Sequence, residues 1–193
     1  MSESSSPSSP SNSAAAIPAA RAAVASQREA VKEYPGKAPA LVRALQVLGD
    51  AQREAGDIAA AEATYREALE AGAKLELPAD AIANVRTSLA TLLDFNGREA
   101  DSVPYYEEAI NNHEALGGEN LEVAAQLRNN LAMTYKGLGK FALAEQHYLR
   151  ALETLENKRG RSSESVACVY NNLAACITPP GFPIRRRRCL RTG

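Results

Sequence analysis

A unit of 41 to 42 residues recurs along this chain, and it constrains the fold more than any other feature. A Leu followed by a small residue stands at Leu48-Gly49, Leu89-Ala90, Leu131-Ala132 and Leu173-Ala174. Three more columns return in the same register: Gly56, Gly97 and Gly139; Tyr65, Tyr106 and Tyr148; Ala68, Ala109 and Ala151. A fixed period of this length indicates stacked copies of one supersecondary unit.

Each column has a physical role in a hairpin of two helices. The small residue after Leu lets the two helices approach closely, whereas a larger side chain would hold them apart. The Gly seven residues later suits a helix C-terminus, because Gly adopts positive φ without steric cost. The second helix then carries an apolar stripe at helical spacing, with Tyr as its large side chain. We therefore expect Tyr65, Tyr106 and Tyr148 to be core residues.

Local signals predict where the helices begin and end. Asp57 is a candidate N-cap for the second helix of the first hairpin. Pro104 falls inside the corresponding stretch of the second hairpin, so we expect that helix to start late, near Asp101 or Ser102. Pro78 and similar breakers separate one hairpin from the next.

The repeat leaves two tails and one extra helix. Residues 1–17 are rich in Ser, Pro and Ala, and we expect disorder there because so little apolar surface can be buried. Residues 18–37 predict a helix that packs on the first hairpin, residues 38–177 hold about 3.5 repeats, and residues 178–193 form an irregular basic tail. Aromatic residues are only 5% of the chain and runs of β-branched residues are absent, so we predict an all-α fold of about eight helices.

The stretch NNLAMTYKGLGKFALAEQHYLRALETLE resembles the tetratricopeptide repeat (TPR), in the 42-residue subtype found in kinesin light chains. The resemblance implies an α-solenoid, in which antiparallel helix hairpins stack into a right-handed superhelix. It also implies a scaffold that binds a protein or peptide segment in a concave groove lined by the first helix of each hairpin. Gln46 and Asp50 stand where chaperone-binding relatives have Lys and Asn, so we do not expect a carboxylate clamp.

The candidate groove residues lie on the first helices, on the side away from the hairpin partner. They are Arg43, Gln46, Asp50, Arg53, Asn84, Thr87, Thr91, Gln126, Asn129, Asn130, Met133, Lys136, Asn171 and Asn172. An Asn amide both donates and accepts, so the two Asn pairs could bond the backbone of an extended ligand. Alternatively, one Asn of each pair satisfies groups between neighbouring hairpins. Cations such as those in the set more often belong to an ordinary solvated helix face.

Patterns for catalysis, cofactors or metals are missing from the sequence. There is no glycine-rich phosphate loop, no HExxH and no DxDxDG. Cys168, Cys176 and Cys189 do not have metal-ligand spacing, and the two histidines, His113 and His147, fall within the repeat pattern. We expect no enzyme activity, no cofactor, no metal and no small-molecule substrate.

Charge and hydropathy bear on location and partners. Five arginines and no acid lie in the last thirteen residues, which leaves 17 basic and 23 acidic residues, a net charge of -6, in residues 1–180. We do not expect the body of the chain to bind nucleic acid. No stretch reaches the roughly 18 apolar residues of a membrane span, and the N-terminus does not resemble a signal peptide. A cytoplasmic protein is the natural expectation.

The C-terminus leaves further alternatives open, because the fourth repeat breaks after its first helix. Val169, Leu173 and Ile177 are expected to form an apolar face without a covering helix, which suggests self-association or truncation. The run from Arg185 to Arg188 suggests an adaptor that binds an anionic polymer or a nuclear partner, but it equally resembles out-of-frame sequence. A third reading is a non-functional fragment of a longer TPR array.

Overall fold

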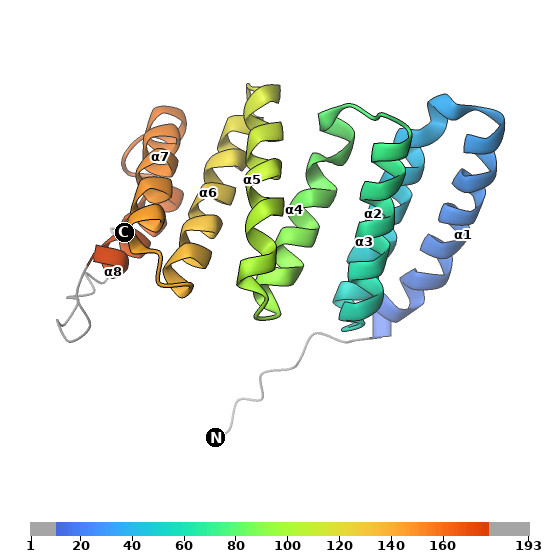
Figure 1. Ribbon diagram of the computed structural model, residues 1–193, viewed down its shortest axis with the longest axis horizontal. Coiled ribbons are helices and arrows are strands. Elements are labelled where there is room, and N and C mark those ends of the chain that lie inside the picture. Colours follow the sequence, from blue (N-terminus) through green and yellow to red (C-terminus); the bar gives the residue numbers. More distant parts are fainter. Residues whose placement is uncertain (1–10, 178–193) are drawn as a thin grey trace, which may run out of the picture. The chain divides into compact units, whose positions relative to one another are not determined.

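The computed structural model describes residues 11–177 of the chain (Figure 1). Disorder was predicted for residues 1–17, but residues 11–17 lie in a helix. Residues 1–10, and the Arg185 to Arg188 run with the rest of the basic tail, lie outside the described residues. The α-helices are α1 (Ser11–Glu33), α2 (Ala38–Glu54), α3 (Ile58–Lys74), α4 (Ala79–Phe95), α5 (Glu99–Leu116), α6 (Asn120–Gly137), α7 (Phe141–Arg159) and α8 (Glu164–Ile177), and η1 (Pro35–Lys37) is a short 3-10 helix.

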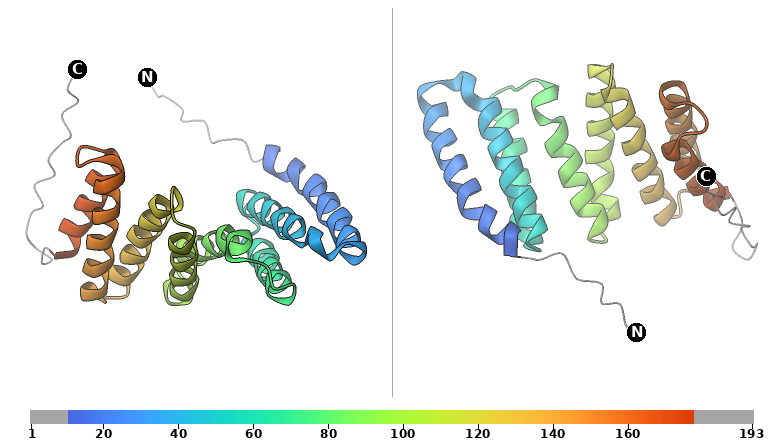
Figure 2. Two further views of the ribbon diagram at one scale, coloured as in Figure 1. Left: turned by 90° about the horizontal axis from the view of Figure 1, so that it is seen from above. Right: turned by 180° about the vertical axis from the view of Figure 1, so that it is seen from behind.

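These helices fall into two compact units, which divide between Gly117 and Gly118. The first unit contains α1 to α5 and the second contains α6 to α8. Within each unit, successive helices run back alongside one another as antiparallel neighbours (Figure 2). The predicted all-α fold with hairpins at the repeat period is confirmed over residues 11–177. None of the helices in this range is long and apolar enough to cross a membrane.

The tyrosine column forms the centre of each hairpin, as predicted. Tyr65, Tyr106 and Tyr148 are fully buried. In the first hairpin the ring of Tyr65 lies directly against Gly49, where a Cβ atom would come within 2.5 Å of its Cε1 atom. The small residue after Leu therefore gives the space that the tyrosine ring occupies.

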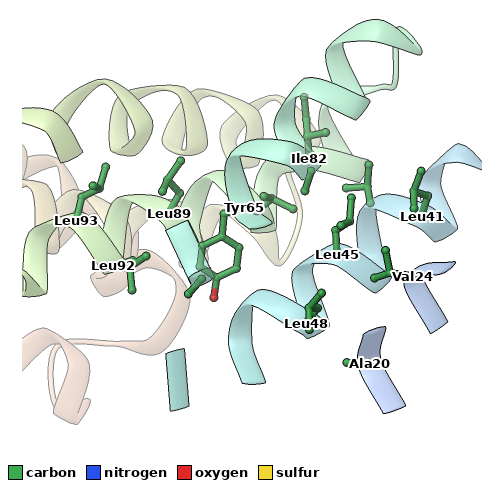
Figure 3. Close-up of a cluster of buried hydrophobic side chains, with 14 residues drawn as sticks. Ala20, Val24, Leu41, Leu45, Leu48, Tyr65, Ile82, Leu89, Leu92 and Leu93 are labelled. Atoms are coloured by element: carbon green, nitrogen blue, oxygen red, sulfur yellow. The ribbon is translucent and has the colours of Figure 1, made fainter. Parts of the chain in front are cut away.

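The extra N-terminal helix packs on the first hairpin, as expected. Ala20 and Val24 of α1 are buried in one apolar cluster with Leu41 and Leu45 of α2 (Figure 3). The helix begins at Ser11, earlier than the predicted boundary at residue 18. Its packing is apolar, which is the main source of stability for a helix of this kind.

The turns inside the hairpins share one geometry. Gly56, Gly97 and Gly139 all have positive φ, between 73° and 83°, as the predicted helix ends require. Asp57 caps α3, because its Oδ1 atom accepts a hydrogen bond of 3.1 Å from the Ala60 N–H. Both predictions are confirmed.

The late start predicted for the helix that contains Pro104 is wrong. Helix α5 begins at Glu99, and Pro104 lies inside it. The start is set by the turn, since the Arg98 N–H donates to the Leu93 carbonyl at 2.9 Å, as Asp57 does to Gln52 in the first hairpin. Pro104 is exposed and lies only in the second turn, so the helix tolerates its missing donor.

The apolar face predicted for the fourth repeat also needs correction. Val169 is only 2% exposed and Leu173 is half-buried, because this side of α8 packs against α6 and α7. Ile177, at the end of α8, is 60% exposed. Of the three residues of the predicted face, only Ile177 is therefore exposed.

Candidate interaction surface

We call α2, α4, α6 and α8 the A helices, since each is the first helix of its repeat. Every predicted groove residue lies on one of them, and the two units carry separate parts of the set. In the first unit the face of α2 and α4 includes Arg43, Gln46, Asp50, Arg53, Asn84, Thr87 and Thr91. In the second unit the face of α6 and α8 includes Gln126, Asn129, Asn130, Met133, Lys136, Asn171 and Asn172.

One hollow lies between the amino-terminal halves of α2 and α4, and we call it the amino-terminal hollow. Its volume is about 160 Å³, and it is lined by Pro39, Arg43, Gln46, Pro78, Asp80, Ala81 and Asn84. Three of the predicted residues therefore meet at one place. Asp80 was not predicted, although it lies one helical turn before Asn84 on the same face, which is a signal the sequence does contain.

A second hollow lies at the carboxyl-terminal ends of the same two helices, and we call it the carboxyl-terminal hollow. Its volume is about 230 Å³, and it is lined by Arg53, Ile58, Thr91, Leu92, Phe95 and Asn96. Phe95 is 84% exposed, and sequence reasoning missed it because it falls outside the repeat columns. The Asn96 amide is used locally, since its Nδ2 atom donates to the Leu92 carbonyl at 2.6 Å.

Two of the predicted residues in the first unit have structural roles. Asp50 accepts a hydrogen bond of 2.5 Å at Oδ1 from the Tyr65 hydroxyl. Burial, followed by this bond to a carboxylate, raises the pKa of Tyr65, so the phenol stays protonated. Thr87 donates through Oγ1 to the Ala83 carbonyl at 3.1 Å. Their polar groups are already occupied and contribute to the packing of the unit.

The Asn residues of the second unit also contact each other. Asn172 of α8 donates through Nδ2 to Oδ1 of Asn129 on α6, at 3.0 Å. Both amide nitrogens also lie close to the Met133 sulfur, at 3.7 and 3.9 Å. One Asn of each pair thus links neighbouring A helices, which is the arrangement that the alternative interpretation described. Asn171 stays exposed and Asn130 half-buried.

The other residues on this face of the second unit are open to solvent to different degrees. Gln126 is exposed and Lys136 is half-buried. Lys136 has no ion pair with any residue in the described range. The second unit thus has polar side chains along its A helices, with Met133 as a half-exposed apolar residue among them.

Among the groups that could support chemistry, Cys168 borders this surface, because its Sγ atom lies 3.9 Å from Nδ2 of Asn172. Within residues 11–177 no cluster of three His, Cys, Asp or Glu side chains could hold a metal ion. His113 is buried, and the His147 ring packs on Tyr135 with a centroid distance of 5.4 Å. Cys168 and Cys176 are free thiols, and burial raises the pKa of Cys176.

Comparisons with known proteins agree with this geometry. Models of the tetratricopeptide repeat match residues 42–71, 81–157 and 123–177. The crystal structure of BtubC (BKLC) from P. vanneervenii is 36% identical, with a TM-score of 0.69 over 86% of this chain. The chain spans 65% of the length of that structure. No curated protein matches significantly.

Two further solved structures are similar in fold. They are the nearly identical TPR-like repeats of a kinesin light chain from Podosopora anserina and a variant of the same repeats with one substitution. Their identities are 17% and 16%, and their TM-scores are 0.62 and 0.64. The alignments cover 88% and 89% of this chain and 87% of each structure.

The fold and the repeat columns define a helical repeat protein built from antiparallel hairpins. The chain belongs to the tetratricopeptide repeat family, and its fold is similar to that of the Podosopora anserina repeats. Repeats of this family generally mediate protein–protein interactions, and their fold is typically a scaffold without catalytic activity.

Proposed function

We propose that this protein is an interaction module that binds a segment of a partner protein along the exposed face of its A helices. Residues 38–177 form the binding array, and α1 covers its amino-terminal end. The module acts by binding alone, without catalysis or a cofactor. Its two described cysteines are free thiols, which fits a reducing compartment, and we propose that it works in the cytoplasm.

The pair of hollows on the first unit is the observation that carries this proposal. Both hollows lie against α2 and α4, and five residues selected from sequence alone line them. Each hollow is smaller than a pocket for a drug-sized ligand, which occupies about 300 to 1,000 Å³. Their size suits the ends of individual side chains, as when an extended segment lies across a repeat surface.

A photo-crosslinking experiment tests the location of binding. The photoreactive amino acid p-benzoylphenylalanine is introduced in place of Asn84 on the A face, or in place of Ala63, which is exposed on α3, as the matched control. After irradiation in extract, crosslinked peptides are identified by mass spectrometry, and each is then synthesised and titrated against the full chain by calorimetry.

The proposal expects adducts at position 84, few at position 63, and saturable binding of the synthetic peptide. Competition provides the second criterion, since the unlabelled peptide should suppress the crosslink. Equal crosslinking at both positions, or adduct peptides that do not bind in isolation, would show that the A face is not the binding surface.

Self-association is a second proposal, and it rests on the C-terminal end of the second unit. Ile177 is 60% exposed there, and Phe141, at the start of α7, is also exposed. If two copies meet through this end, light scattering of the full chain will show a mass that rises with concentration, and Ile177→Lys will abolish the rise. Tyr34→Lys is the control, because Tyr34 has similar exposure at the other end of the chain. A constant monomer mass for the unmodified chain rejects the proposal.

A further inference from the structure

The amino-terminal hollow contains four polar side chains whose functional groups are unused within the protein. Arg43 and Gln46 come from α2, and Asp80 and Asn84 come from α4. None of the four side chains forms a hydrogen bond or an ion pair with another residue in the described range. Arg43, Asp80 and Asn84 are exposed, and Gln46 is half-buried.

Several charged side chains elsewhere in the first unit are paired within the protein. Arg86 of α4 pairs with Glu108 at 2.6 Å, and Arg98 pairs with Glu62 at 2.8 Å. Arg43 and Asp80 have opposite charges and line the same hollow, yet they do not come within 4 Å of each other. A cation and an anion therefore face one small space separately.

The repeat register places these two charges at different levels along the helices. With a period of 41 residues, Asn84 is the equivalent of Arg43, and Asp80 is the equivalent of Pro39. Asp80 thus lies four residues nearer the helix start than the level of Arg43, an offset of about 6 Å along the axis. Alternate side chains on one face of an extended chain are about 6.6 Å apart, which is a similar interval.

We propose that the amino-terminal hollow recognises an extended protein segment with one acidic and one basic side chain two residues apart. The acidic side chain binds Arg43 and the basic side chain binds Asp80. The amide of Asn84, at the level of Arg43, and the amide of Gln46, about one turn further along α2, then bond the backbone of the segment, since each amide both donates and accepts. This inference rests on the proposed function and specifies the sequence that the A face selects.

Ligands with a single charge are disfavoured by the same arrangement. An anion drawn to Arg43 meets the carboxylate of Asp80 in the same hollow, and a cation drawn to Asp80 meets the guanidinium of Arg43. Specificity then arises from repulsion of the wrong ligand as much as from attraction of the right one.

Capped tripeptides test the inference without knowledge of the natural partner. The probes are acetyl-Glu-Gly-Lys-amide and acetyl-Lys-Gly-Glu-amide, and the controls are acetyl-Gln-Gly-Lys-amide and acetyl-Glu-Gly-Gln-amide. Each is titrated into the ¹⁵N-labelled full chain, and the side-chain NH₂ signals of Gln46 and Asn84 are followed by NMR. We expect one charge order to bind at least about threefold more tightly than both controls.

Variants show whether the two charges are responsible. Arg43→Gln and Asp80→Asn should each remove the advantage, and the exchange Arg43→Glu with Asp80→Lys should reverse which order binds better. A purely structural role of these exposed residues would not reverse the preference. Unchanged circular dichroism confirms that each variant is folded.

The inference is overturned if neither probe shifts the Gln46 and Asn84 signals, if the singly charged controls bind as well, or if the preference survives in both single variants. Crosslinking at position 84 does not depend on these charges. Crosslinking with failed tripeptide binding would remove only this inference, whereas tripeptide binding without any crosslinked protein would reject the proposed function.

Discussion

Gly49→Ala probes the closest approach between the two helices of the first hairpin. The added methyl group would lie 2.5, 2.7 and 3.0 Å from three atoms of the Tyr65 ring. The ring cannot easily move away, because Tyr65 is fully buried and its hydroxyl is hydrogen-bonded to Asp50. Overpacking of this kind costs about 1 to 3 kcal/mol.

A second effect has the opposite sign and must be subtracted. Replacing Gly by Ala inside a helix stabilises it by roughly 0.5 to 1 kcal/mol, because the unfolded chain loses conformational freedom. The net expectation is a destabilisation of about 1 kcal/mol, or a decrease in Tm of about 2 to 4 °C for a chain of this size. Helical circular dichroism during thermal and urea unfolding measures it.

The double variant and a matched control identify the cause. In a Tyr65→Leu background the ring is gone, so Gly49→Ala should cost less than in the wild type or become stabilising. Gly137→Ala serves as the control, since no atom lies within 4 Å of its added Cβ, and it should be neutral or slightly stabilising. The reasoning is refuted if Gly49→Ala melts at or above the wild type, or if its cost is the same in both backgrounds.

Three other predictions concern a cap, a paired carboxylate and a thiol. Asp57→Ala should lower the unfolding free energy by about 1 kcal/mol, measured by urea unfolding, while Asp57→Asn keeps most of the cap. The pKa of Glu62 is lowered: burial opposes ionisation, but hydrogen bonds from two arginines outweigh it. The stabilisation from ionised Glu62 is therefore present above pH 4.5 and lost as the pH falls below it. Glu62→Gln should weaken the dependence of the unfolding free energy on pH in this acidic range, measured by urea unfolding at several pH values. Cys168 is exposed and Cys176 buried with a raised pKa, so peptide mapping after brief maleimide treatment should find Cys168 labelled before Cys176.

The hairpins could be predicted from the sequence because each repeat column satisfies one local structural requirement. A tyrosine that recurs in register with small residues is expected to fill the space that those residues leave between two helices. Tyr65 and Tyr106 are fully buried, as this argument requires. The glycines were equally readable, since positive φ at a helix end is a property of the backbone alone. Because the same residues recur at the same offsets in successive repeats, these columns are not a chance pattern.

The features that were missed depend on how one helix is placed against another. The start of α5 is the exception, because it follows from a local hydrogen bond between the Arg98 N–H and the Leu93 carbonyl, which repeats the bond between Asp57 and Gln52 one period later. Asp80 joins the amino-terminal hollow only because α4 lies beside α2. The bond between Asn129 and Asn172 likewise spans 43 residues of sequence, so no local pattern could choose it over binding to a ligand.

In the first unit, some charged side chains join helices through ion pairs, and others are unpaired and available to a ligand. Between α3 and the start of α5, Glu62 binds Arg98, and α1 is joined to α3 through Arg28 and Glu67. These pairs join neighbouring repeats, and a ligand would have to break them before it could use the same charges. At the amino-terminal hollow no such competition exists, because Arg43 and Asp80 have no partner to lose within the described residues. Unpaired groups bind a ligand without the loss of an internal pair, which supports the A face as the candidate binding surface.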